Sequence, residues 1–152
     1  MSFADNPVFL RYRWRMGAWG VLAFDNDEAN DWAYGFDEVS DLSLVDDAFH
    51  RIEASAGRYL EQGDAAEALA ACEVVARLRG RSGYTNAYTE KVDRWVAEHP
   101  ITPSPELIAR GNAVIDRILG TDSELRALWE EAGDGEWQAA VANLRTRMTG
   151  SG

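Results

Sequence analysis

Cysteine and long apolar runs are nearly absent from this chain of 152 residues. Its single cysteine, Cys72, excludes a disulfide within the chain, and a thiol in an alanine-rich segment behaves as a small hydrophobic group. No apolar run approaches the roughly 20 residues that a membrane-spanning helix needs, and the apolar stretch at residues 7–10 is too short for the core of a signal peptide. These features predict a cytoplasmic protein.

The short motifs that identify common catalytic and cofactor sites are also missing. The chain contains no phosphate-binding loop, no dinucleotide fingerprint, no paired CxxC and no HExxH. We therefore predict no cofactor and assign no catalytic residue. A binding protein is favoured over an enzyme.

Basic residues are few compared with acidic ones, 15 against 26, which gives a formal net charge of −11. Most of the excess lies in residues 25–53, where ten acidic residues face one base, Arg51. Such a chain is repelled by phosphate backbones and by anionic membrane surfaces, which disfavours binding to nucleic acid or membranes. A basic protein partner or a cation fits better. The alternative is that the acidic residues cap helices and form a solvated face.

The first fifteen residues differ in composition from the rest of the chain. Arg11, Arg13 and Arg15 alternate with apolar residues, a pattern typical of a short strand or an extended arm. We expect residues 1–15 to form a basic extended arm or extension. Residues 16–149 should form a single all-α domain, and residues 150–152 a flexible tail.

Capping residues and apolar spacings of three and four predict a compact all-α bundle of about seven short helices. Asp25 and Glu28 have the spacing of a capping box, which predicts a first helix that ends near Gly35. Ser104 and Pro105 are typical of a helix start. The six further helices are predicted over residues 43–62, 64–80, 87–99, 104–120, 121–133 and 134–148.

The most distinctive segment precedes and begins the first predicted helix. Two glycines on either side of Trp19 would let the backbone turn tightly, so that Trp19 and Phe24 pack under that helix. This arrangement predicts a structural role for the segment. The residues concerned, which we call the signature residues, are Gly17, Trp19, Gly20, Phe24, Asp25, Asn26, Asp27 and Trp32.

The signature residues form the pattern G-x-W-G followed by F-D-N-D and then by the pair Asp31 and Trp32. In this pattern the chain resembles a bacterial family of domains of unknown function. The similarity extends over about residues 16–148, while the basic arm lies outside the family pattern. The resemblance implies a small helical bacterial domain and supplies no activity, cofactor or catalytic residue.

We interpret the acidic segment as the contact surface of a small protein–protein interaction module that docks a basic partner. Opposite charges would steer the encounter, and an exposed aromatic side chain within the segment would be a hot spot. An immunity-like or antitoxin-like role is one form of this function. The candidate partner-binding residues are Asp31, Asp37, Glu38, Asp41, Asp46 and Asp47.

The alternative function is a metal-dependent enzyme. Asp27 and Asp31 lie four residues apart and would share a helix face, and carboxylates are the ligands that Mg²⁺ and Ca²⁺ prefer. Asp46 and His50 have the same spacing on the next predicted helix. These four residues are the candidate metal ligands. A weaker alternative is an acidic mimic of a nucleic acid, which would require carboxylates spaced like phosphates.

Overall fold

The computed structural model describes residues 18–133 and 135–150. This part of the chain contains seven α-helices, one 3₁₀ helix and no strand apart from two isolated bridges, which confirms the predicted all-α class. The predicted arm, together with Met16, Gly17, Asp134 and residues 151–152, lies outside the described residues. The elements are α2 Asp27–Ala33, η2 Tyr34–Glu38, α3 Ser43–Glu53, α4 Gln62–Leu78, α5 Glu90–Glu98, α6 Pro105–Leu119, α7 Glu124–Ala132 and α8 Glu136–Thr149.

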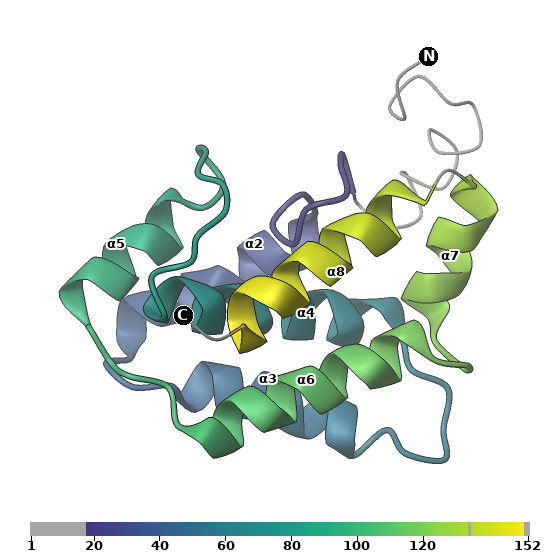
Figure 1. Cartoon of the computed structure of the whole chain (residues 1–152), viewed down its shortest axis with the longest axis horizontal. Coiled ribbons are helices and arrows are strands. Elements are labelled where there is room, and N and C mark those ends of the chain that lie inside the picture. The colour runs from purple at the N-terminus through teal and green to yellow at the C-terminus, as the bar shows by residue number, and fades with distance from the viewer. Residues whose placement is uncertain (1–17, 134, 151–152) are drawn as a thin grey trace.

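Helix α4 lies at the centre of the fold and packs against each of the other six α-helices (Figure 1). Within residues 65–77 every side chain except Glu67 is buried. Six of the buried residues are alanines, whose small side chains let neighbouring helices approach from all sides. The helix is therefore a core element, whereas its sequence predicted one apolar face.

Some helix ends follow the predicted capping signals. The Ser104 hydroxyl accepts a hydrogen bond from the Leu107 N–H at 3.1 Å, and Pro105 is the first residue of α6. Helix α7 ends at Ala132 and is capped by Gly133, which adopts the left-handed conformation with φ of 89°. The start of α6 and the end of α7 therefore confirm the predicted helix boundaries. Both could be predicted because the capping residues lie within one turn of the helix end.

The second predicted helix is shorter than expected, since α3 ends at Glu53 and not at residue 62. The Ser55 hydroxyl donates to the Ile52 carbonyl at 2.6 Å, and Gly57 adopts φ of 80°, which no helix accommodates. The chain then runs to Leu60, whose N–H donates to the Asp122 carbonyl at 2.8 Å. This hydrogen bond fixes the start of α4 close to the start of α7.

The core is one continuous cluster that includes side chains from all seven α-helices. Four of the five tryptophans in the described part are buried, and Trp19 is half-buried, with its ring 4.8 Å from that of Tyr88. None of the described helices is long and apolar enough to cross a membrane. The buried tryptophans are Trp32, Trp95, Trp129 and Trp137.

Candidate functional site

Residues 18–26 form a tight loop ahead of α2. The Trp19 N–H donates to the Asp25 carbonyl at 2.9 Å, and the Asp25 carboxylate accepts from the Leu22 N–H at 3.1 Å. A Cβ atom at Gly20 would lie 2.3 Å from that carboxylate, so any larger residue at position 20 would displace the Asp25 side chain. Burial raises the pKa of Asp25, although the hydrogen bond from Leu22 acts in the opposite direction.

The cap of α2 is Asn26, and the predicted capping box of Asp25 and Glu28 is wrong. The Asn26 side-chain oxygen accepts from the Ala29 N–H at 2.8 Å, while Asp25 is used within the loop. Phe24 is fully buried. The contacts of these signature residues therefore lie within the domain.

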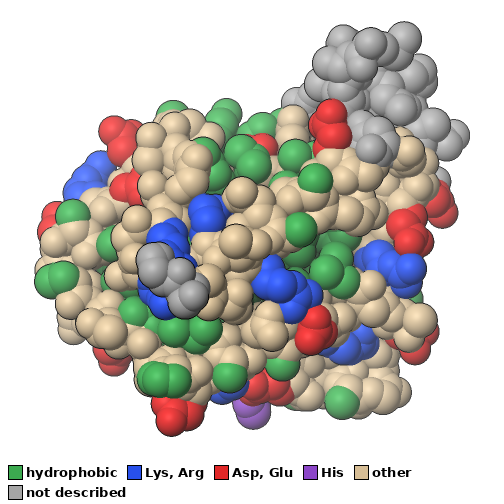
Figure 2. All heavy atoms as spheres, viewed as in Figure 1, with side chains coloured by type: hydrophobic (Ala, Val, Ile, Leu, Met, Phe, Trp, Pro, Cys, Tyr) green, Lys and Arg blue, Asp and Glu red, His purple; other side chains and the backbone are tan. Residues whose placement is uncertain are grey.

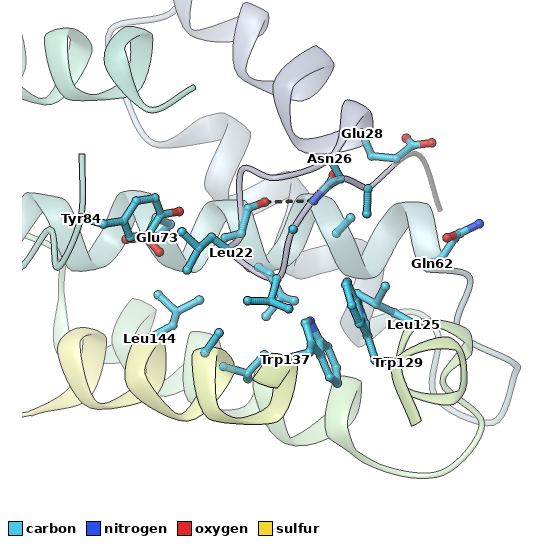
Figure 3. Close-up of a pocket in the computed structure, with 18 of the residues that line it drawn as sticks. Leu22, Asn26, Glu28, Gln62, Glu73, Tyr84, Leu125, Trp129, Trp137 and Leu144 are labelled. Carbon is cyan, nitrogen blue, oxygen red and sulfur yellow. Dashed lines mark hydrogen bonds between the residues drawn. The ribbon is translucent and has the colours of Figure 1, made fainter. Parts of the chain in front are cut away.

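A small cavity lies between the loop at residues 18–26, α4, α7 and α8 (Figure 3). Leu125, Trp129 and Trp137 lie toward one end, and Glu73 and Tyr84 lie at the other. Its volume is about 40 Å³, which is room for a few water molecules at about 10–15 Å³ each. Pockets that bind drug-sized molecules measure about 300 Å³ or more, so this cavity fits water.

Two of the three acidic residues of α3, Asp46 and Glu53, pair with Arg110 of α6. The Arg110 Nη1 donates to the Asp46 carboxylate at 2.5 Å, and its Nε and Nη2 donate to the two Glu53 oxygens at 2.8 and 3.0 Å. The hydrogen bond from Arg110 lowers the pKa of Glu53. Asp46 is therefore already paired within the chain, which makes it a weaker candidate for contact with a partner.

The four candidate metal ligands lie on two helices, Asp27 and Asp31 on α2 and Asp46 and His50 on α3. Over residues 18–133 and 135–150 no group of three or more His, Cys, Asp or Glu side chains could hold a metal ion. Asp46 binds a guanidinium instead. The geometry gives the metal-dependent alternative no support.

The other candidate partner-binding residues are all exposed, but they differ in their contacts. The Asp41 carboxylate accepts from the Ser43 N–H at 3.0 Å at the start of α3, and hydrogen bonds from the side chain and backbone of Ser43 lower the pKa of Asp41. Four of the carboxylates form no ion pair with another described residue: Asp31, Glu38, Asp41 and Asp47.

Tyr34 is the most exposed large apolar side chain in the described part, at 62%. It begins η2, and because residues three apart eclipse one another in a 3₁₀ helix, Asp37 lies on the same face. Lys91 of α5 contacts both residues. Its Nζ is 2.9 Å from each Asp37 carboxylate oxygen and 5.0 Å from the centre of the Tyr34 ring. We call these three residues the Tyr34 site.

The 3₁₀ helix η2, which carries Tyr34 and Asp37, is held in place by aromatic packing. The buried Phe36 ring lies 5.2 Å from Trp32 and 4.7 Å from Trp95, measured between ring centres. The Trp95 indole N–H donates to the Val39 carbonyl at 2.9 Å, just after η2 ends. These contacts hold η2 against α5, and Asp37 and Lys91 face each other across this junction.

An open groove of about 400 Å³ runs between η2 and α5, at the end of the molecule where α5 is labelled in Figure 1. Phe36 and Trp95 form its buried lining, and the His99 ring stacks on Trp95 with 4.6 Å between ring centres. The size falls within the range of ligand-binding pockets. Its charged lining residues are Asp37, Glu38, Lys91, Arg94 and Glu98.

Neither Tyr34 nor Lys91 is among the residues that the sequence predicted for the site. Lys91 carries a signal in composition, since it is the only lysine in a chain with 14 arginines. The sequence contains no comparable signal for the exposure of Tyr34, because a tyrosine at a helix end can face either the core or the solvent.

On the face shown in Figure 2, several Lys and Arg side chains lie near the middle of the view and others toward its edges, while Asp and Glu lie mostly toward its outline. Some of the arginines hold the end of α8. The Arg79 Nη1 donates to the Met148 carbonyl at 2.5 Å, and Arg81 donates to the Gly150 carbonyl. These two basic side chains have a structural role in addition to their charge.

The family model described as "Domain of unknown function (DUF4259)" matches residues 17–140 of the chain. No curated protein and no solved structure matches the chain.

Proposed function

The chain belongs to the DUF4259 family, and we propose that it is an acidic protein-interaction module that docks a basic surface of another protein. The observation that carries the proposal is the exposed Tyr34 ring within the acidic segment. Asp31 and Asp37 lie three residues to either side of it. An aromatic anchor surrounded by charged residues is typical of a binding hot spot and its rim.

The charge of the surrounding residues supports a basic partner. Asp31, Glu38 and Asp47 are exposed and have no ion pair with the described residues, so their charges remain available to steer an approaching cationic surface. Asp41 and Asp46 contribute less to the attraction of a cationic surface. Asp41 already accepts a hydrogen bond from the Ser43 N–H, and Asp46 already pairs with Arg110. The proposed surface is therefore centred on Tyr34. An immunity-like or antitoxin-like role is one form that such docking takes.

The experiment compares three tagged proteins as bait in an extract of the organism that encodes the chain. The first is the wild type, and the second carries Tyr34→Ala, Glu38→Lys and Asp47→Lys. The third is a control with Glu106→Lys and Glu131→Lys, which changes the net charge by the same amount at exposed positions outside the acidic segment. Circular dichroism and thermal melting establish that all three fold alike.

We expect one basic protein to bind the wild type and the control at roughly equal molar amounts, and to be lost from the triple variant. Mass spectrometry of the eluates identifies it. Equal retention by the triple variant and the wild type would contradict the proposed surface. Loss from the control alone would place the contact on another face.

A further inference from the structure

We infer that the Tyr34 site binds a guanidinium group, and that Lys91 fills the site in the free protein until an arginine of the partner displaces it. The inference rests on the proposed function and specifies the chemistry of its central contact. It depends on the arrangement of Tyr34 and Asp37 of η2 with Lys91 of α5, which lies 54 positions from Asp37 along the chain.

The ammonium of Lys91 marks the position that a bound cation takes. It lies 2.9 Å from both oxygens of Asp37 and 5.0 Å from the centre of the Tyr34 ring, within the range of a cation–π contact. The carboxylate and the ring are therefore spaced to hold one cation between them. An acidic side chain alone would not define such a position.

Arginine suits this pair of groups better than lysine does. A planar guanidinium can donate two parallel hydrogen bonds to the Asp37 carboxylate and stack on the Tyr34 ring, whereas an ammonium acts as a point charge. The site is also open to an incoming chain. The Tyr34 residue is 62% exposed and the Asp37 side chain 59%, while that of Lys91 is 31% exposed.

Lys91 can leave the site at little cost. Ion pairs between exposed side chains contribute little to stability, and lysine has a long flexible stem. The groove beside the site is lined by Glu38 and Glu98, so a displaced ammonium still lies near negative charge. Arg94 lines the same groove but makes no ion pair with Asp37, which makes it a matched control for charge.

The test is an NMR titration of the full chain with capped tetra-arginine and tetra-lysine peptides. Because Lys91 is the only lysine, protein grown on lysine labelled at its ε carbon gives a single side-chain signal that reports whether Lys91 stays on Asp37. Backbone amide shifts then map the bound peptide. The variants are Lys91→Met, Asp37→Asn and, as the control, Arg94→Met.

We expect tetra-arginine to move the Lys91 signal and to bind about threefold more tightly than tetra-lysine. Lys91→Met should tighten tetra-arginine binding by about fivefold, since the internal competitor is gone, and Arg94→Met by less than about twofold. Asp37→Asn should weaken it by about fivefold. Equal effects of Lys91→Met and Arg94→Met would overturn the inference, because they would reduce it to general charge attraction.

Two further outcomes separate the inference from the proposed function. Shifts confined to α3 around Asp47, with the Lys91 signal unmoved, would overturn the guanidinium site and leave the acidic interaction module standing. Absence of peptide-induced shifts throughout residues 31–47 would overturn both.

Discussion

Glu73 and Arg147 lie 74 positions apart in the chain and form a two-bond ion pair inside the molecule. The Arg147 Nη1 and Nη2 lie 2.5 and 3.0 Å from the two Glu73 oxygens. The Arg147 side chain is 12% exposed and that of Glu73 is 1% exposed. Arg147 also donates to the carbonyls of Arg81 and Ser82 at 3.0 and 2.9 Å. The pair therefore ties α8 to α4 and to the loop that follows α4.

Replacing Arg147 with methionine should lower the free energy of unfolding by about 3 kcal/mol, because Glu73 would stay buried with only Arg77 nearby, at 3.3 Å. Urea denaturation measures the loss. The control is Arg126→Met, which removes a surface pair with Glu130 and should cost less than about 1 kcal/mol. Similar losses in both variants would show that the internal pair contributes no more than a surface one.

Gly111 lies where α6 packs against Phe49 of α3 and Met148 of α8. A Cβ atom there would lie 2.8 Å from the Met148 sulfur and 3.2 Å from the Phe49 ring, and both side chains are fully buried. Gly111→Ala should therefore destabilise the fold by about 1–2 kcal/mol through overpacking. At Gly63 the nearest atom is 3.5 Å away, so Gly63→Ala should stabilise by up to about 1 kcal/mol. Thermal melts that shift in the same direction would refute this contrast.

Fold class and several helix ends could be predicted because their signals are local. Ser104 and Pro105 start α6 through contacts within one turn of the chain. The all-round burial of α4 could not be predicted, since it depends on six helices that surround it. The early end of α3 was missed for a different reason: the apolar spacing continues past Glu53, although Gly57 already carried a stop signal.

The candidate site was predicted in part. Asp37 and Asp46 are exposed acidic residues, as the sequence indicated, but each is paired with a cation from another helix. Lys91 is 54 positions from Asp37, and Arg110 is 64 positions from Asp46. Such pairings depend on helix packing and leave no trace in local spacing. The sequence therefore indicated where charge accumulates, while the structure indicates which charges remain available.

Cys72 should not react with thiol reagents in the folded protein. It is fully buried, its sulfur lies 3.8 Å from the Gly111 carbonyl, and burial raises the pKa of the thiol, so the reactive thiolate is both inaccessible and scarce. We expect no reaction with Ellman's reagent in buffer and one equivalent in denaturant. Ala109→Cys, at an exposed position of α6, should add one equivalent that reacts at once. Rapid native reaction of the wild-type chain would contradict the packing of α4.

Acid should remove the contribution of the ion pair between Glu53 and Arg110. The hydrogen bond from Arg110 holds the pKa of Glu53 below its ordinary value of 4.5. A carboxyl with a lowered pKa in the folded state stabilises the fold above its ordinary pKa, and this contribution disappears as the pH falls through the lower value. Glu53→Gln should therefore destabilise by less than about 1 kcal/mol at neutral pH, because both side chains of the pair are partly open to solvent, Arg110 at 31% and Glu53 at 42%.

At a pH well below the lowered pKa of Glu53, the variant and the wild type should unfold at the same urea concentration, because Glu53 is then protonated in both the folded and the unfolded chain. Glu131→Gln is the matched control, since Glu131 is exposed and forms no ion pair with a described residue. Glu131→Gln should leave the midpoint of urea denaturation unchanged both at neutral pH and in acid. A difference between Glu53→Gln and the wild type that persists undiminished in acid would mean that the glutamine perturbs packing, and that the charge of Glu53 is not what stabilises the contact between α3 and α6.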